Sequence, residues 1–352
     1  MTVRLVAKAA LVGAALVALV VTPRPVVADP VEDFYKGKRI TLVDGYEAGS
    51  PFDVYARLLA RHLGAHIPGT PSVIVQNMPG AGSLTATNHL FNVAVRDGSV
   101  FGNFHGNMGL EPKVEGSGTR YDGRKFTWIG SMAKQTLVCV TWGTSGFKTV
   151  DDLRARPALA GSSGGTAGSA SIFPRVMNSL LGTKFKLVTG YTDNDLPLAL
   201  ERREVDSRCG VGWASIKATR PQWITEKKIF TPVVLSLKTH PELPEVPTIM
   251  NYVSKLDDRA TLEVMFTPQE AGRPFAAPPG IPADRANTLR RGFDAALKDP
   301  VLLSEADKGK IEIEPISGEE IEAMLVRLYD LPDSVFSRVL SYRQPGANET
   351  SR

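Results

Sequence analysis

The sequence lacks the marks of a fibrous or disordered chain. Its 32 glycines and 25 prolines are scattered among apolar runs, without a collagen-like period, a fixed-period repeat or a long low-complexity tract. Hydrophobic residues make up 43% and charged residues 22% of the chain, which is typical of globular proteins. The 352 residues correspond to about two domains of roughly 150 residues each.

An excess of charge of one sign is also missing once residues 1–28 are set aside. The formal net charge is +4, of which Arg4, Lys8 and Arg24 contribute +3, so the rest of the chain carries +1. No basic stripe is left to follow a phosphate backbone. The sequence therefore predicts that nucleic acid is not a partner.

Long apolar runs are absent after residue 28, and the run before it is short. Arg4 and Lys8 precede the uncharged segment Ala9–Val21, and Val26-Val27-Ala28 supplies small residues before Asp29. This order is typical of a secretory signal peptide, and the segment is shorter than the about 20 residues of a spanning helix. No cysteine follows it, so a lipoprotein anchor is not expected. We predict a signal peptide over residues 1–28 and an exported protein, with an uncleaved anchor as the alternative.

Cysteine is scarce as well, with only Cys139 and Cys209 in the chain. Export would place both in an oxidising compartment. Each lies in an apolar, strand-like run, Leu137–Trp142 and Cys209–Trp213. One disulfide and two buried free thiols are both compatible with this pattern.

The chain after the expected signal peptide alternates short β-rich runs with helical patterns. Arg39–Val43, Ser72–Gln76 and Val100–Phe104 are expected strands, and Asp53–His66 and Leu84–Val95 are expected helices. Strand, glycine loop, helix and strand in succession are typical of a parallel α/β sheet.

A second unit of the same kind is expected from Phe126 onward. Its expected strands are Leu137–Trp142, Phe185–Thr189, Val205–Val211 and Ile229–Leu235. Its expected helices are Val150–Arg156, Ile172–Leu181 and Asp195–Arg203, with a Gly/Ser loop over residues 160–169. After a proline-rich stretch, helices return over Pro282–Lys298, Pro300–Gly309 and Gly318–Tyr342.

One motif suggests an enzyme. Residues 161–165 match the G-x-S-x-G pattern of serine hydrolases, with Ser163 as the nucleophile. The preceding segment Arg156–Ala160 is a poor buried strand, and His240 is the one downstream histidine that could complete a triad. An exported serine hydrolase is therefore the alternative function. The other interpretation is a loop whose backbone N–H groups face a ligand.

Two further patterns fall short of a cofactor or metal site. Gly80–Thr85 follows a strand and opens a helix, but Thr85 stands where a dinucleotide fingerprint has its third glycine. His62 and His66 are spaced i, i+4, without the intervening Glu of H-E-x-x-H and without an obvious third ligand. We therefore predict no cofactor and no metal.

Three polar loops share one chemistry. Residues 45–53, 79–83 and 162–169 each follow an expected strand and precede an expected helix. They would lie at the carboxyl ends of strands, where open α/β sheets bind ligands. They offer hydroxyls and N–H groups with few cations, which suits a small carboxylate held by neutral donors and helix dipoles.

At these loops the chain resembles the Bug-type substrate-binding proteins of tripartite tricarboxylate transporters. The most specific motif is Asn77-Met78-Pro79-Gly80-Ala81-Gly82-Ser83, which resembles the family's N-x-P-G-A-G-G loop. The resemblance extends over most of residues 35–330. Further matching segments are Tyr35–Val43, Gly49–Asp53, Ala56–Leu59, Asp97-Gly98, Gly190-Tyr191, Leu198–Leu200, Glu204–Asp206, Leu243–Thr248, Pro278–Ala283 and Leu297–Pro300.

This resemblance implies a two-lobed α/β protein with the type II periplasmic binding protein fold and no enzymatic activity. Each lobe would be a mixed, mostly parallel sheet flanked by helices. We expect lobe one over residues 29–130 plus 245–352 and lobe two over residues 131–244. The monomeric receptor would capture a small organic carboxylate between the lobes and deliver it to membrane subunits of the transporter. A sensor kinase is the alternative partner.

The resemblance and the three loops together define the expected ligand-binding residues. They are Tyr46, Glu47, Ala48, Gly49, Ser50, Phe52, Asp53, Pro79, Gly80, Ala81, Gly82, Ser83, His105, Asn107, Ser162, Ser163, Gly165, Thr166, Ser169 and Tyr191.

The chain departs from the family pattern most clearly at Glu47, an acid in a loop that is usually neutral. If Glu47 faces the cleft, its charge disfavours a tricarboxylate and favours a monocarboxylate, aromatic acid or amino-acid-like ligand. Tyr46, Phe52 and Tyr191 would then form apolar walls. Asp53 is expected to act structurally, as the N-cap of the following helix.

Overall fold

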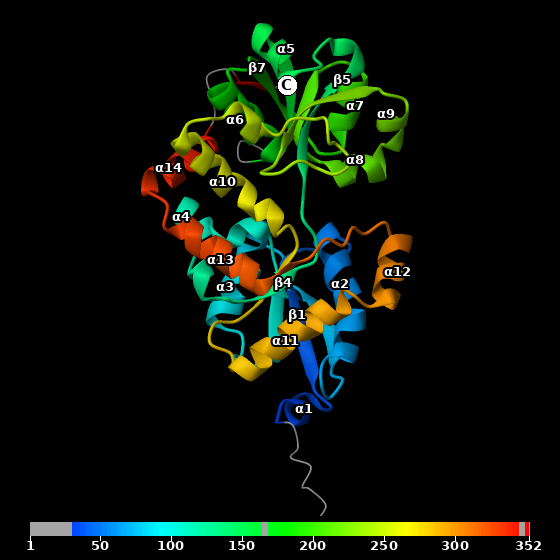
Figure 1. The fold of residues 1–352 in the computed structure, drawn as a ribbon, viewed down its shortest axis with the longest axis vertical. Coiled ribbons are helices and arrows are strands. Elements are labelled where there is room, and N and C mark those ends of the chain that lie inside the picture. The colour runs from blue at the N-terminus through cyan, green and yellow to red at the C-terminus, as the bar shows by residue number, and fades with distance from the viewer. Residues whose placement is uncertain (1–29, 164–167, 345–348, 352) are drawn as a thin grey trace, which may run out of the picture.

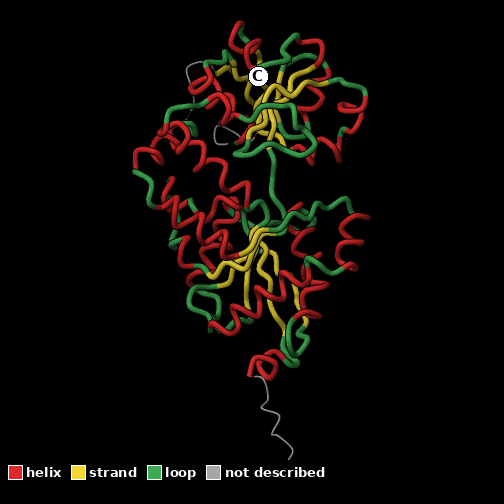
Figure 2. The backbone as a smooth tube through the Cα atoms, in the orientation of Figure 1, coloured by secondary structure: helices red, strands yellow, loops and turns green. Residues whose placement is uncertain are grey.

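The computed structural model describes residues 30–163, 168–344 and 349–351. The expected signal peptide, Gly165 and Thr166 lie outside the described residues. The chain forms two lobes, each with a six-stranded sheet at its centre and helices around it (Figures 1 and 2). Within the described part, no helix is both long and apolar enough to cross a membrane.

The sheet of lobe one has the strand order β11-β4-β10-β3-β1-β2. Its strands are β1 (Arg39–Asp44), β2 (Ser72–Asn77), β3 (Val100–Asn103), β4 (Thr127–Ser131), β10 (Pro274–Ala277) and β11 (Ile316–Ser317). Strand β1 pairs in parallel with β2 and β3, whereas β10 pairs antiparallel with β3 and β4. Its helices are α1 (Pro30–Tyr35), α2 (Pro51–Leu63), α3 (Leu84–Asn92), α4 (Glu111–Val114), α11 (Ala283–Ala296), α12 (Pro300–Lys308) and α13 (Gly318–Tyr329).

The sheet of lobe two has the order β12-β7-β6-β8-β5-β9. Its strands are β5 (Leu137–Trp142), β6 (Ala158–Ser163), β7 (Phe185–Tyr191), β8 (Ser207–Gly212), β9 (Ile229–Leu235) and β12 (Glu349–Ser351). Strands β6, β7 and β8 pair in parallel, and β5 pairs antiparallel with β8 and β9. Its helices are α5 (Val150–Ala155), α6 (Ser169–Leu181), α7 (Asp195–Glu201), α8 (Trp213–Thr219) and α9 (Pro221–Thr225). The expected two-lobed α/β fold with mixed sheets is confirmed.

Three connections join the lobes. The chain crosses after β4, crosses back through α10 (Leu256–Glu270), and crosses again through α14 (Asp333–Ser341) to β12. Helix α10 runs between the lobes in Figure 1 and adds Leu262 and Phe266 to the core of lobe two. The exact limits of the lobes stay a prediction. We expected all of residues 245–352 in lobe one, but β12 belongs to the sheet of lobe two. This difference arises because the chain crosses a third time, and no local sequence pattern marks that crossing.

Several elements differ from their expected form. Residues 160–163 belong to strand β6, although we expected a loop there after a poor strand. Small residues suit this central strand: a Cβ at Gly161 would lie 2.4 Å from Leu196 Cδ2. The expected long helix over Gly318–Tyr342 is divided into α13 and α14 just before and after Pro332, because proline lacks a backbone N–H. Helix α2 begins at an N-cap formed by Ser50, not by Asp53.

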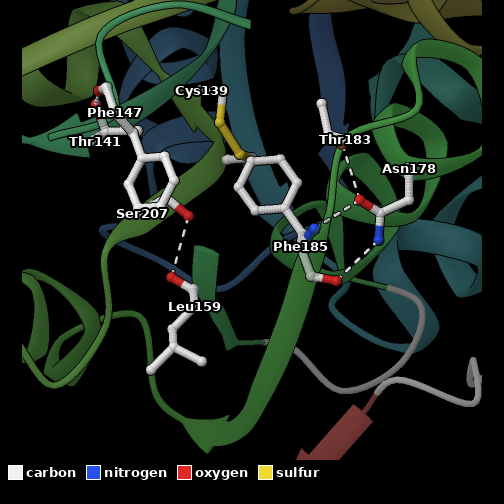
Figure 3. Close-up of a disulfide and its surroundings, with 9 residues drawn as sticks. Cys139, Thr141, Phe147, Leu159, Asn178, Thr183, Phe185 and Ser207 are labelled. Atoms are coloured by element: carbon white, nitrogen blue, oxygen red, sulfur yellow. Dashed lines mark hydrogen bonds between the residues drawn. A yellow bond between two sulfur atoms is a disulfide. The ribbon is translucent and has the colours of Figure 1, made fainter. Parts of the chain in front are cut away.

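Cys139 and Cys209 form a disulfide between β5 and β8 (Figure 3). The two residues are direct partners in the antiparallel register, and both are fully buried. Figure 3 shows the bond beside the Phe185 ring in the core of lobe two. The disulfide alternative is therefore the correct one, and the described residues contain no free cysteine.

Candidate functional site

A cavity of about 590 Å³ lies between the lobes. Its walls come from the ends of β1 and β3 and the loop before α3 in lobe one, and from α6 and β8 in lobe two. Helices α4, α10 and α14 complete it on the side where these helices cluster in Figure 1. The carboxyl ends of strands thus face a ligand-sized space, as expected for an open α/β sheet.

The structure brings six of the expected ligand-binding residues together around this cavity. Those that line it are Tyr46, Ala81, Gly82, His105, Asn107 and Ser169. They come from both lobes, so a ligand in the cavity would contact both lobes at once.

The remaining expected residues lie elsewhere. Glu47, Ala48 and Gly49 are exposed in the loop before α2, and Pro79 and Gly80 are exposed before α3, and none of these lines the cavity. The charge of Glu47 therefore lies outside the cavity, and the ligand preference that we expected from an inward-facing Glu47 does not follow from this structure.

Two further residues of the expected set, Phe52 and Ser83, contact residues that line the cavity. The Tyr46 ring stacks on buried Phe52, with centroids 4.1 Å apart and planes inclined by 11°. Buried Ser83 accepts a hydrogen bond on Oγ from the His105 backbone N–H at 3.0 Å. Burial raises the pKa of Tyr46 to about 12, so its phenol is a neutral donor at physiological pH.

The loop before α3 has an unusual backbone. Four consecutive residues have positive φ: Gly80 at 141°, Ala81 at 47°, Gly82 at 62° and Ser83 at 78°. Ala81 and Ser83 adopt this conformation at a cost, and such strain gathers at ligand sites. A Cβ at Gly82 would meet nothing within 4 Å, so this glycine leaves open space at the cavity.

A buried polar network holds the loop over residues 45–53 in place. The Asn77 side-chain amide donates to Asp44 Oδ2 at 3.0 Å, to the Tyr46 carbonyl at 2.9 Å and to Asp53 Oδ1 at 2.8 Å. Asp53 Oδ2 accepts from the Gly49 N–H and from Arg57 Nε, each at 2.8 Å. Asp53 is buried and holds this loop in place, but as the third residue of α2 and not as the N-cap that we expected.

A chain of polar contacts leads from the cavity to the C-terminal segment. His105 Nδ1 accepts a hydrogen bond from the Asn107 backbone N–H at 3.3 Å and lies 2.6 Å from Asn107 Oδ1. Asn107 Nδ2 reaches Glu111 Oε2 at 3.4 Å, and Arg343 holds Glu111 through both of its carboxylate oxygens. Burial lowers the pKa of His105, so its imidazole is neutral at physiological pH.

The serine hydrolase alternative finds no support. Ser163 lies on β6, is buried, and donates from Oγ to Asp193 Oδ1 at 2.6 Å. The Ser162 hydroxyl contacts the Ser171 hydroxyl, and Tyr191 is buried with its hydroxyl 3.3 Å from Glu204 Oε2. None of these three residues lines the cavity.

The histidine pair does not form a metal site. His62 Nε2 lies 2.7 Å from Glu305, and His66 Nε2 lies 2.9 Å from Asp299, so each imidazole tethers α2 to the α12 region. Among the residues with described positions, no cluster of three His, Cys, Asp or Glu is arranged to hold a metal.

Sequence reasoning missed two residues near the site. Gln269 lines the cavity from α10, and neither Nε2 nor Oε1 of its buried amide has a hydrogen-bond partner among the described residues. Arg273 lies behind the Phe52 ring, 4.3 Å from its centre, on the face that Tyr46 leaves free. Arg273 forms no ion pair with any described acid, and burial lowers its pKa. Both residues belong to α10 and β10 regions that the sequence pattern did not predict.

Comparisons with known proteins agree with this architecture. No family model matches the chain. A UPF0065 protein from the TAR-I ttuE–ttuC′ intergenic region of Agrobacterium vitis is 23% identical over 313 residues, which cover 82% of this chain and 79% of that protein.

The solved structures of similar fold are binding proteins. A TctC solute-binding protein from Polaromonas has a TM-score of 0.69 at 19% identity, covering 87% of this chain and 99% of its own. The periplasmic binding protein BugD has a TM-score of 0.57 at 20% identity, covering 88% and 98%. Two Rhodopseudomonas palustris proteins, MatC with bound malate and one with adipate, have TM-scores of 0.54 and 0.58 at 17% and 18% identity. Both cover 87% of this chain, and 99% and 97% of their own. Together with the motifs over residues 77–83 and 243–248, these comparisons confirm the resemblance to the Bug/TctC-type substrate-binding proteins of tripartite tricarboxylate transporters.

Proposed function

We propose that the protein is a periplasmic solute receptor that binds a small organic carboxylate between its lobes and delivers it to a membrane transporter. The observation that carries this proposal is the interlobe cavity, which neutral donors from both lobes line. The Tyr46 hydroxyl, the backbone around Gly82 and the Asn107 amide are suitable partners for carboxylate oxygens. The Ser169 hydroxyl donates to the Gly210 carbonyl at 2.9 Å, so the donors of lobe two are the first backbone N–H groups of α6. The malate and adipate bound by the R. palustris proteins support a carboxylate as the ligand class.

The geometry of α6 adds to this support. The helix is 13 residues long and begins at Ser169, a lining residue. Its first N–H groups lie at the positive end of the helix dipole, which favours an anion. Binding of one carboxylate by the loops of lobe one and by α6 of lobe two would hold the two lobes together.

The remaining parts of the proposal are the absence of enzymatic activity, a monomeric state and a tripartite tricarboxylate transporter as the partner. The transporter partner follows from the family resemblance and would be tested by pull-down with the membrane subunits.

A thermal shift screen of the chain from Asp29 onward against a carboxylate library tests the function. A ligand at 100-fold excess over its Kd adds about 2.7 kcal/mol of stability, which raises the melting temperature visibly. We expect at least one carboxylate to do so, with calorimetry giving 1:1 binding. A library without any stabilising carboxylate would contradict the proposal. So would labelling of Ser163 by a fluorophosphonate with turnover of an activated ester, for which Ser163→Ala is the control.

A further inference from the structure

One wall of the cavity is apolar and contains none of the donor residues described above. Apolar side chains from α4, α6, α10 and α14 form it: Val114, Ile172, Phe173, Val264, Met265 and Val339. A compact, fully polar ligand such as citrate would leave this wall in contact with polar groups or water. An apolar ring or chain would instead bury surface against it, at about 25 cal/mol for each Å² removed from water.

The charges that line the cavity also disfavour a polyanion. Glu111, Glu115 and Arg343 are its charged lining residues, and they sum to one negative charge. Arg343 is engaged by both acids, at 2.8 Å to Glu111 and 2.6 Å to Glu115. A second ligand carboxylate near these acids would therefore be repelled, because no lining cation is left to pair with it.

One positive charge near the cavity could balance a single ligand carboxylate. Arg273 is half-buried behind the stacked Phe52 and Tyr46 rings, outside the cavity lining, and forms no ion pair with a described acid. Its positive charge acts through these rings on the Tyr46 end of the cavity, which favours one carboxylate there over two or three.

Gln269 marks a polar position on the apolar wall. The residue is 8% exposed and lines the cavity, and neither atom of its side-chain amide has a partner among the described residues. Both amide atoms are turned away from solvent, so the amide must rotate toward the cavity to meet a ligand. The backbone carbonyl of Gln269 accepts from the Gln135 N–H at 2.8 Å, which fixes the helix at this residue. A buried amide left without partners costs free energy, so a ligand group that can both donate and accept is favoured here.

We propose that the ligand is an amphipathic monocarboxylate, with an apolar ring or chain that carries a hydroxyl or amine, and that Gln269 is the specificity-determining residue for that substituent. This inference rests on the proposed receptor function. The carboxylate contacts the neutral donors near Gly82, and the apolar body packs on α6, α10 and α14. The substituent exchanges hydrogen bonds with the Gln269 amide, which rotates from its enclosed position into the cavity when the ligand binds.

Titration calorimetry with fixed probes tests this inference. The probes are benzoate, its three monohydroxy derivatives, hexanoate, 6-hydroxyhexanoate, malate and citrate. We expect the tightest monocarboxylate to bind at least tenfold more tightly than malate and citrate. We also expect the tightest hydroxylated acid to bind about fivefold more tightly than its parent acid, which is the net value of about one hydrogen bond.

The variant Gln269→Leu should remove the difference between the hydroxylated acid and its parent while leaving the parent's affinity within about twofold. Gln222→Leu on α9, away from the cavity, is the matched control and should keep the wild-type difference. If Gln269→Leu does not fold, Gln269→Met gives the same test with a flexible side chain of similar length.

Each contrary result refutes a different part of the proposal. Tightest binding of malate or citrate would refute the monocarboxylate and leave the receptor function intact. An unchanged preference for the hydroxylated acid in both Gln269 variants would refute the role of Gln269. Failure of all eight probes to bind would refute the amphipathic ligand, and failure of the wider carboxylate library as well would refute the receptor function itself.

Discussion

Asp44 at the end of β1 is a fully buried carboxyl group beneath the first ligand loop. Burial, with a further contribution from the charge of Asp53, raises the pKa of Asp44 to about 7. Its Oδ1 atom has no hydrogen-bond partner among the described residues, and neither has Oδ1 of buried Asn103. Asp44 and Asn103 are register partners on β1 and β3, so their side chains lie on the same face of the sheet. A proton on Asp44 would turn one of the two acceptors into a donor.

Asp44→Asn should therefore weaken the pH dependence of stability. In the wild type the folded state binds the Asp44 proton more tightly than the unfolded state does. The protonated carboxyl therefore stabilises the folded state at acidic pH, and this stabilisation is lost as pH rises through about 7. The amide cannot ionise, and the variant should lose about 2 kcal/mol less unfolding free energy than the wild type between pH 5 and pH 8. Urea unfolding at pH 5 and pH 8 measures the free energy of unfolding of both proteins. Parallel pH profiles for the two proteins would show that Asp44 does not titrate in this range.

Gly82→Val tests the backbone of the second ligand loop. A side chain at Gly82 meets open space at the cavity, so we expect the affinity for the tightest carboxylate to fall at least about tenfold. The φ of 62° adds strain of roughly 1–2 kcal/mol, which leaves the protein folded. Calorimetry and thermal unfolding measure the two effects separately.

Gly45→Ala is the contrasting variant. A Cβ there would lie 2.5 Å from Ser83 Cβ, so overpacking should reduce the free energy of unfolding by roughly 1–3 kcal/mol. If Gly82→Val unfolded the protein and Gly45→Ala did not, the two glycines would have the opposite roles to those argued here.

The expected ligand-binding residues that line the cavity lie in loops that follow strands of the sheets. They include Tyr46, Gly82, His105 and Asn107, and their role in binding stays a prediction. Glu47 shows the limit of that reasoning, because the direction of a side chain in a loop depends on contacts that local sequence does not encode. Gln269 was not foreseeable for a related reason: its importance arises from the packing of α10 against the other lobe.

At the scale of elements, strands and helices with clear periodicity were predicted to within a few residues. Strands β1, β2, β5 and β9 and helices α2, α6 and α11 are examples. Helix α10 was missed because it has no single apolar face: Thr261, Leu262, Val264, Phe266 and Thr267 are all buried as it passes between the lobes. Strand β10 was missed because four residues, Pro274–Ala277, are too few to show an alternating pattern.

The disulfide between β5 and β8 is an element-scale prediction. It closes a chain segment with a sequence separation of 70 residues, which includes β6, α6 and β7. Restricting the unfolded chain in this way typically stabilises a protein by about 2–4 kcal/mol. The double variant Cys139→Ala/Cys209→Ala should lose about that amount in denaturant unfolding. Its loss should match that of the wild type treated with a reductant strong enough to open a buried bond. Equal stability of oxidised and reduced wild type would contradict the expected contribution.

At the scale of the whole molecule, two adjacent residues connect the lobes outside the sheets. We call Tyr342 and Arg343 the interlobe clasp. The Tyr342 hydroxyl donates to Ser179 Oγ at 3.1 Å and its carbonyl accepts from Arg175 at 2.8 Å, both on α6 of lobe two. Arg343 binds Glu111 on α4 of lobe one and the adjoining Glu115. Arg343 lines the cavity, and its partner Glu111 also contacts Asn107 there, so the clasp adjoins the site.

Arg343→Gln should therefore affect both stability and the separation of the lobes. The side chains of Arg343 and Glu111 are only 19% and 12% exposed, so removing the cation leaves a largely buried carboxylate unpaired. We expect a loss of roughly 2–3 kcal/mol in unfolding free energy. Small-angle scattering of the ligand-free variant should give a larger radius of gyration than the wild type, because α4 is released from the C-terminal segment.

Arg327→Gln is the matched control. It breaks an ion pair with Glu263 in which the two side chains are 54% and 34% exposed, and it should cost no more than about 0.5 kcal/mol of unfolding free energy without a change in the radius of gyration. Equal losses in the two variants, or an unchanged radius in Arg343→Gln, would show that the clasp is an ordinary surface ion pair and that the crossings between the sheets alone set the distance between the lobes.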